Sequence, residues 1–279
     1  MKAVFNWTGK RKLPGLILVV SALVLSSTAF AQTFERGLEA YNSGEYGAAL
    51  HEWLPLANQG HPAAQTSLGF MYETGNGVWQ DDSEAVGWYL KAAAQDHADA
   101  QFNLAVMYDE GRGTALDDTE ATRWYRRAAE QGHVSAQYNL GLMYIWGEGV
   151  EISEAEAARW HHAAAEQGHA SAQASLGSMY DAGKGVRQNY GAAVKWKRLA
   201  AERGHAQAQA YLGDMYGVGA YVSQDNIQSH MWYSIAVFNG LGEASRSRSR
   251  IAARMTEAEI SEALILARVC LETNYKQCG

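Results

Sequence analysis

Cysteine is scarce in this chain of 279 residues, which contains only Cys270 and Cys278, both within the last ten positions. Their spacing differs from the C-x-x-C spacing of a redox-active pair. In an exported protein such a pair is expected to form a disulfide, here one that fixes the C-terminal end. Closing so short a loop would stabilise the fold by about 2–3 kcal/mol.

Long apolar runs are also scarce, and the one at residues 16–25 lies in a leader-like context. Four basic residues stand between positions 2 and 12, and Ala-Phe-Ala at 29–31 is an A-x-A cleavage site. We expect a signal peptide over residues 1–31, cleaved after Ala31. The alternative is a retained anchor, but the run is shorter than the roughly 20 residues that a spanning helix needs. With no second such run, the mature protein is expected to be soluble.

Basic charge is in deficit once the leader is set aside. Residues 32–279 carry 19 Lys and Arg against 30 Asp and Glu, a net charge of −11. This argues against binding to nucleic acid or to anionic lipid. One basic cluster exists, at Arg246, Arg248, Arg250 and Arg254. We interpret it as a solvated helix face rather than a nucleic-acid site.

Catalytic motifs are missing from the sequence. There is no H-E-x-x-H, no G-x-S-x-G, no S-x-x-K and no P-loop. The recurring G-x-G-V segments lack the preceding strand and the further glycine of a phosphate-binding loop. We therefore expect no enzyme activity and no cofactor.

What the sequence does contain is a regular period. The dipeptide Ala-Gln recurs every 36 residues, at 64, 100, 136, 172 and 208. A fixed period of 20–50 residues is typical of stacked-repeat folds. Such solenoids rarely carry chemistry of their own, and they present an extended surface to a partner.

Each repeat is predicted to contain two helices. In the first, Ala64, Leu68, Gly69 and Tyr72 share one face, and Gly75 suits a left-handed C-cap. The second starts at a favoured N-cap residue in all five copies: Asp81, Asp117, Ser153, Asn189 and Asp225. In four copies a Glu or Gln follows three residues later, as in a capping box: Glu84, Glu120, Glu156 and Gln228. Capping explains these carboxylate pairs better than acid–base chemistry does.

A tryptophan also recurs at one position of the second helix: Trp88, Trp124, Trp160, Trp196 and Trp232. Each would bury on the order of 150–250 Å². We interpret these residues as core between helix pairs rather than as a ligand-stacking platform.

These patterns predict an all-α fold, a right-handed α-solenoid of stacked helix-turn-helix repeats. We expect a degenerate N-terminal capping repeat at 32–60 and five repeats at 61–96, 97–132, 133–168, 169–204 and 205–240. Residues 241–279 would form C-terminal capping helices, the last one starting at Thr256 with Glu259 completing its capping box.

The repeat A-Q-x-x-L-G-x-M-Y-x-x-G-x-G-V, then D-x-x-x-A-x-x-W-Y-x-K-A-A and Q-G-H, resembles the Sel1-like repeat, a relative of the tetratricopeptide repeat. The segment from Arg254 to Ile260, followed by the two cysteines, looks like the ending of exported bacterial members. The fifth copy departs from the pattern at Tyr221 and at residues 239–241. The resemblance implies an adaptor or scaffold in bacterial signalling, envelope or exopolysaccharide regulation, or host interaction.

By analogy with tetratricopeptide solenoids, the first helices would line a concave groove. Positions 66, 70, 73 and 74 of the first full repeat vary between repeats. Together with their equivalents in the other repeats they form a second helical face, apart from the core. The resulting candidate partner-binding residues are Phe70, Glu73, Phe102, Val106, Asp109, Glu110, Tyr138, Leu142, Ile145, Trp146, Asp181 and Asp214. Aromatic residues beside fixed charges are typical of binding hot spots. The alternative is that they pack on neighbouring repeats or face water, which we favour for the acidic ones.

Histidines recur in the turn between repeats, at 61, 97, 133, 169 and 205. Residues one repeat apart lie about 10 Å or more apart, too far for one zinc ion. We therefore expect turn residues and no metal site.

The leading hypothesis is an exported, non-enzymatic scaffold that holds a protein or peptide with basic and apolar residues, in the periplasm or after secretion. A second is a periplasmic regulator that restrains an envelope sensor or an exopolysaccharide pathway. A third is a cell-wall or β-lactam-related enzyme. The β-lactam-associated relatives carry a cysteine pair in each repeat, which this chain lacks.

Overall fold

A computed structural model describes residues 30–278, and within that range the secondary structure consists of helices without strands. The predicted signal peptide lies almost wholly outside the described residues. None of the helices in this range is both long enough and apolar enough to cross a bilayer. The all-α prediction is confirmed.

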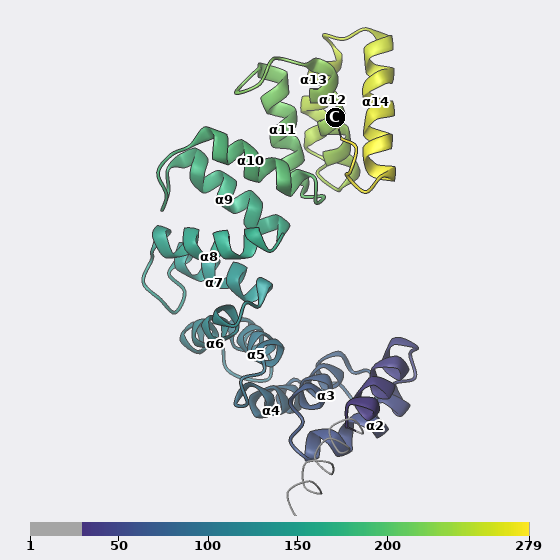
Figure 1. Cartoon of the computed structure of the whole chain (residues 1–279), viewed down its shortest axis with the longest axis vertical. Coiled ribbons are helices and arrows are strands. Elements are labelled where there is room, and N and C mark those ends of the chain that lie inside the picture. Colours follow the sequence, from purple (N-terminus) through teal and green to yellow (C-terminus); the bar gives the residue numbers. More distant parts are fainter. Residues whose placement is uncertain (1–29, 279) are drawn as a thin grey trace, which may run out of the picture. The chain divides into compact units, whose positions relative to one another are not determined.

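The chain divides into two compact units, the first ending at His97 and the second starting at Ala98 (Figure 1). In the first, residues 30–42 are helical, and three further helices follow: α2 (Tyr46–Asn58), α3 (Pro62–Thr74) and α4 (Asp82–Ala93). Helix α3 packs against both α2 and α4.

The second unit contains ten helices in described residues, and most of them form antiparallel pairs. They are α5 (Ala98–Glu110), α6 (Asp118–Glu130), α7 (Val134–Trp146), α8 (Glu154–Glu166), α9 (Ala170–Ala182), α10 (Tyr190–Ala201), α11 (Ala206–Val218), α12 (Asn226–Phe238), α13 (Ala244–Ala252) and α14 (Glu257–Glu272). Each odd-numbered helix from α5 to α11 pairs with the next, and each pair stacks on the one that follows. We call α3, α5, α7, α9 and α11 the first helices and their partners the second helices.

The Ala-Gln dipeptide links consecutive repeats. Its alanine is buried, and its glutamine amide donates to a backbone carbonyl at the end of the preceding second helix, as Gln137 Nε2 does to Ala129 O across 3.2 Å. In four of the five copies the same glutamine also accepts from the end of the second helix of its own repeat, as Gln137 Oε1 does from Gln167 at 2.8 Å. A buried carbonyl that lost this partner would cost about 1–3 kcal/mol. The dipeptide therefore recurs because its glutamine bonds the end of the preceding second helix, at Gln65, Gln137, Gln173 and Gln209.

The predicted N-caps of the second helices are confirmed at all five positions. Each side chain accepts from a backbone amide of the first turn, as Asp117 Oδ1 does from Glu120 at 3.0 Å. The reciprocal bond of a full capping box is present at Thr256 and Glu259. In the second and third repeats the glutamate instead pairs with an arginine three residues later, for example Glu156 with Arg159.

The histidines at the turns cap the first helices, which extends the prediction that they are turn residues. At His61, His133, His169 and His205 the Nδ1 atom accepts from the amide three residues on. An imidazole that accepts at Nδ1 is held in one orientation, so its ring face points in a fixed direction.

The recurring tryptophans are core residues, as predicted, and glycines at fixed positions let the two helices of a repeat approach closely. Trp88, Trp124, Trp160 and Trp232 are buried and Trp196 is half-buried. Gly69 lies against the ring of Tyr89, where an added Cβ would come within 2.6 Å of the ring. The first helix therefore needs glycine here because the second helix crosses at close range.

Helix α13 keeps the period of the repeats. Ala244 stands 36 residues after Ala208 and is buried like it, and α13 packs on α12 as α9 packs on α8. It therefore occupies the place of a sixth first helix, which the sequence analysis did not recognise.

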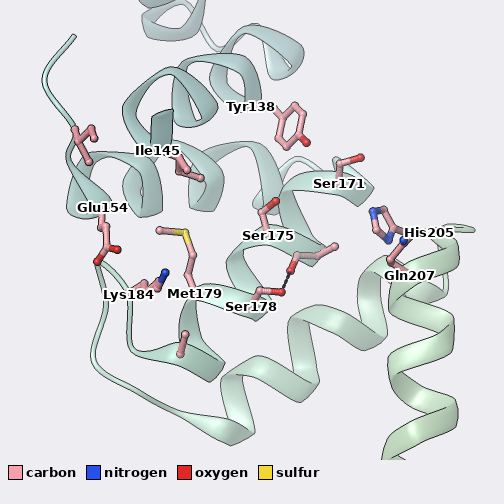
Figure 2. Close-up of a pocket in the computed structure, with 13 residues that line it drawn as sticks. Tyr138, Ile145, Glu154, Ser171, Ser175, Ser178, Met179, Lys184, His205 and Gln207 are labelled. Carbon is pink, nitrogen blue, oxygen red and sulfur yellow. Dashed lines mark hydrogen bonds between the residues drawn. The ribbon is translucent and has the colours of Figure 1, made fainter. Parts of the chain in front are cut away.

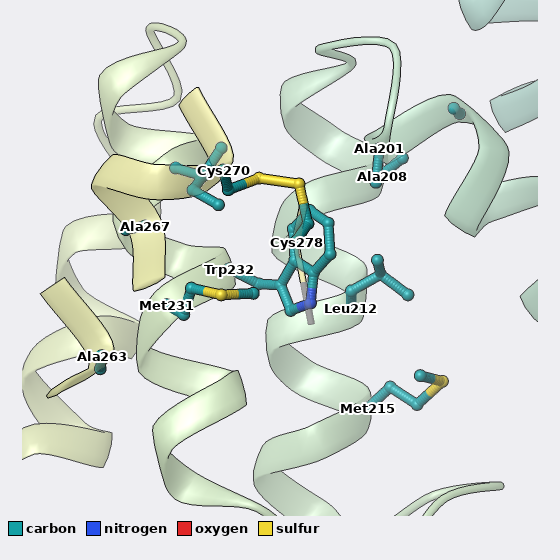
Figure 3. Close-up of a cluster of buried hydrophobic side chains, with 12 residues drawn as sticks. Ala201, Ala208, Leu212, Met215, Met231, Trp232, Ala263, Ala267, Cys270 and Cys278 are labelled. Atoms are coloured by element: carbon teal, nitrogen blue, oxygen red, sulfur yellow. A yellow bond between two sulfur atoms is a disulfide. The ribbon is translucent and has the colours of Figure 1, made fainter. Parts of the chain in front are cut away.

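Helix α14 closes the end of the second unit. It packs on α12, and its Cys270 forms a disulfide with Cys278, as expected for an exported chain. Figure 3 shows this disulfide beside the ring of Trp232, within a cluster that includes Leu212 and Met231.

Candidate functional site

We define the first-helix face of the second unit as the surface formed by residues 102–110, 138–146, 174–182 and 210–218 of its first helices. It includes ten of the twelve predicted partner-binding residues, whereas Phe70 and Glu73 belong to the first unit. Trp146 is the most exposed of the predicted apolar residues, at 58%. Val106, Leu142 and Ile145 are half-buried.

The aromatic residues of this face are partly used in packing. Phe102 stacks on His133 with ring centroids 4.5 Å apart, and Tyr138 stacks on His169 at 4.6 Å. In each case an aromatic residue of one first helix covers the histidine that caps the next. Both side chains remain half-buried, so part of each ring is available to a partner.

Four of the five predicted acidic residues are held by side chains of the second helix of the same repeat. Tyr125 donates to Asp109 at 3.0 Å, as Tyr89 does to Glu73, and Tyr233 donates to Asp214. A tyrosine hydroxyl is neutral, so it positions the carboxylate without cancelling its charge. Asp181 is paired with Lys197, and Glu110 with Arg112.

The first-helix face carries charge of one sign. The four first helices of the second unit contain Asp99, Asp109, Glu110, Asp181 and Asp214, and they contain no lysine or arginine. The basic residues of these repeats lie on second helices and in loops. A partner surface with positive charge would therefore be complementary to α5 in particular, where three of the five acids lie.

Helix α13 carries the opposite, positive charge. By the period, Arg246 and Arg250 correspond to Tyr138 and Leu142, and both arginines are exposed. Burial is the main effect that raises the pKa of Tyr233, and the charge of Arg250 lowers it by a smaller amount. Arg250 therefore lies near the Tyr233–Asp214 pair. From the sequence we interpreted these arginines as a solvated helix face, without relating them to the repeats. Adding 36 to the groove positions of the fifth repeat would have assigned them to the same face.

A cavity of about 680 Å³ lies over α9, between α7 and the start of α11 (Figure 2). Tyr138 and Ile145 line it from α7, Met179 from α9, and His205 and Gln207 from the start of α11. The other residues of α9 that line it are small: Ser171, Ala174, Ser175, Ser178 and Ala182. The volume lies within the range of small-molecule and side-chain binding sites.

The third repeat departs from the shared pattern at this cavity. Where three other repeats have an acid, it has Ile145, and where three other repeats have a glutamine that bonds a helix carbonyl, it has Ile152. Both isoleucines line the cavity, and 67% of Ile152 is exposed. These substitutions exchange polar contacts within the repeat for apolar surface.

His161 takes the place of the tyrosine in that repeat and is fully buried, stacked on Tyr138 at 5.4 Å. Neither ring nitrogen has a hydrogen-bond partner within 3.5 Å among the described residues. Burial lowers the pKa of His161 to about 4, against a smaller raising effect from the backbone of Tyr138. The ring is therefore neutral at pH 7 and forms an apolar backing for Tyr138.

Metal chemistry finds no support in the described part of the chain, where no three His, Cys, Asp or Glu side chains gather closely enough to hold an ion. The stacked pairs and the open face instead define a helical-repeat protein of the class that binds other polypeptides. The Sel1 repeat model matches residues 62–97, 98–133, 134–169, 170–205 and 206–237, so the chain belongs to the Sel1 repeat family. These matches begin one residue later than the predicted boundaries.

Two solved structures are similar over most of the chain. A Sel1 repeat protein from Oxalobacter formigenes is 37% identical, with a TM-score of 0.70 over 74% of this chain and 85% of that one. A protective antigen present in uropathogenic Escherichia coli strains, displaying an SLR fold, is 34% identical, with a TM-score of 0.78 over 91% of this chain and 56% of that one. The chain thus spans little more than half of the antigen. Comparison with curated protein sequences gives no match.

Proposed function

We propose that this protein is an exported, non-enzymatic scaffold that binds a partner polypeptide along the first-helix face of its second unit. The observation that carries the proposal is the cavity over α9, which is bordered by Tyr138 and by two isoleucines that replace polar residues of the repeat. A fold that needed only to stack its repeats would not require these substitutions. Export is supported by the Cys270–Cys278 disulfide and by the leader-like N-terminal sequence.

The charge pattern supports one direction of the bound partner along this face. The acidic residues of α5 favour basic residues in the part of the partner that lies over α5. Arg246 and Arg250 favour acidic residues in the part that lies over α13. Neighbouring helices pack about 10 Å apart, so four repeat steps span about 40 Å. An extended segment of about twelve residues covers that length at about 3.3 Å per residue. Apolar side chains would lie in its middle, over α7 and α9.

The proposal is tested by photo-crosslinking in cells, with a benzoylphenylalanine probe in place of Trp146. A matched probe in place of Glu130, which is exposed at the end of α6, reports non-specific contacts. We expect a discrete adduct from position 146 alone, and mass spectrometry then identifies the partner.

The identified partner is next titrated against a Tyr138→Ala, Trp146→Ala double variant. We expect affinity to fall about tenfold or more, because truncation of central aromatic residues removes hot-spot contacts. Trp79→Ala is the control, since Trp79 is 94% exposed and lies in the first unit. Equal affinity of the double variant and wild type would overturn the assignment of this face.

A further inference from the structure

Aromatic side chains of the protein itself cover three of the four histidines that cap first helices. Phe34 stacks on His61 at 5.4 Å, and Thr66 Oγ1 lies 3.1 Å from His97 Nδ1. Phe102 stacks on His133 and Tyr138 on His169, with angles of 21° and 27° between the ring planes.

The fourth capping histidine, His205, is paired by the period with Ala174. A methyl group cannot cover an imidazole ring, and both residues line the cavity over α9. Figure 2 shows His205 on the wall of the cavity formed by the start of α11, facing the small side chains of α9. The cavity therefore includes the place where the two preceding repeats put an aromatic ring.

His205 is held as a stacking surface. Its Nδ1 accepts from the amide of Ala208 at 3.3 Å, which fixes the plane of the ring. Burial lowers the pKa of His205, so the ring is neutral at pH 7. Aromatic pairs with centroids 4.5–7 Å apart attract each other beyond the effect of the area that they bury.

Resting on the function proposed above, we infer that the partner inserts an aromatic side chain into this cavity and stacks it on His205. The incoming ring completes the row of stacks that Phe102 and Tyr138 begin. The hydroxyls of Ser171 and Ser175 and the amide of Gln207 line the same cavity, so a tyrosine or tryptophan would find hydrogen-bonding groups for its polar atom.

Two variants address the stack directly. Ala174→Tyr supplies the missing ring from within the chain, in the position that Tyr138 has one repeat earlier. His205→Asn keeps an N-capping side chain and removes the ring. Their matched controls are Thr66→Tyr, the same position in the first unit, and His61→Asn, where Phe34 already covers the ring and neither residue lines the cavity.

The probe is a phage library of random twelve-residue peptides, selected on purified residues 32–279. We expect the selected peptides to share an aromatic residue. Their affinity should fall about tenfold or more on Ala174→Tyr and on His205→Asn, and it should hold on both controls. Circular dichroism and thermal melting verify that each variant folds. If one variant does not fold, the other carries the comparison.

Three results would count against the inference. Peptides that lack an aromatic residue, or that bind both folded variants as well as wild type, would overturn the stack on His205. If those peptides still lost affinity to the Tyr138→Ala, Trp146→Ala variant, the proposed function would stand without it. Failure to select any peptide, together with no adduct from position 146 in cells, would overturn both.

Discussion

Lys197 Nζ lies 3.1 Å from Asp181 Oδ2, and only 9% of the lysine side chain is exposed. In the first two repeats the same position holds Tyr89 and Tyr125, whose neutral hydroxyls bond Glu73 and Asp109. The fourth repeat thus replaces a neutral donor with a buried cation. The carboxylate of Asp181 is consequently required by the fold, whatever it contributes to binding.

Asp181→Asn should therefore lower the free energy of unfolding. The substitution leaves a nearly buried ammonium without a counter-charge, and we expect a loss of about 1–3 kcal/mol. Urea unfolding followed by circular dichroism measures it. The matched variant Lys197→Tyr restores the tyrosine–acid pair of the first two repeats, beside a glycine, Gly177, that corresponds to Gly69 next to Tyr89. We expect it to stay within about 1 kcal/mol of wild type, and equal losses in both variants would contradict this account.

Acid should destabilise the protein in part through His161. Burial holds the folded-state pKa at about 4, below the ordinary value of 6.5. Between these values the unfolded chain binds more protons than the folded one, so the free energy of unfolding falls as the pH drops from 6.5 towards 4. The full effect amounts to about 3 kcal/mol at most.

His161→Phe keeps an aromatic ring and removes the titrating group. Thermal unfolding of both proteins between pH 7 and 4.5 isolates its contribution, because other histidines with lowered pKa, such as His133, His169 and His205, titrate in both. We expect the variant to lose less stability on acidification. Parallel curves would mean that His161 is not the buried neutral group described above.

Local features of the fold could be predicted from the sequence. The N-caps at Asp81 and Asp117 and the left-handed C-cap at Gly75 depend on a few neighbouring residues, so the pattern within one repeat was enough. The buried tryptophans followed from the helical period of a single segment. Comparison of the repeats with one another separated these packing positions from variable ones.

The site depended on contacts that one repeat does not contain. The stack of Tyr138 on His169 joins residues 31 positions apart, in different repeats. Ala174 looked like an ordinary variable position, and only the geometry showed that its small size opens a cavity beside His205. Asp109 was predicted as a partner contact, and its bond to Tyr125 required knowing which face of the second helix meets the first.

Glycine has opposite roles at two positions, which gives a matched pair of substitutions. Gly185 has a φ of +67°, and an added Cβ would lie 2.0 Å from the carbonyl oxygen of Glu154. Gly185→Ala should therefore lower the free energy of unfolding by about 2 kcal/mol or more, through the backbone conformation and the clash.

Gly87 lies within α4 with nothing within 4 Å of an added Cβ. Gly87→Ala should raise stability by about 0.5–1 kcal/mol. Thermal unfolding of the Gly185→Ala and Gly87→Ala variants tests both expectations. Destabilisation by Gly87→Ala would show an unrecognised constraint in α4.

Reduction of the disulfide should weaken the C-terminal end of the second unit. Cys270 and Cys278 are both buried, and the disulfide joins the end of α14 to the cluster around Trp232 (Figure 3). Because the loop that it closes spans a sequence separation of 8, its loss should cost about 2–3 kcal/mol in the chain-entropy model. The loss of stability should be confined to α14 and its contacts with α12.

Hydrogen exchange of wild type, compared with that of a Cys270→Ser, Cys278→Ser variant, measures this loss, with dithiothreitol-treated wild type as the parallel sample. We expect faster exchange in α14 and α12 and unchanged exchange in α3 and α4, which belong to the other unit. Uniformly faster exchange along the chain would mean that the stack unfolds as one cooperative body, and that the disulfide stabilises all of it.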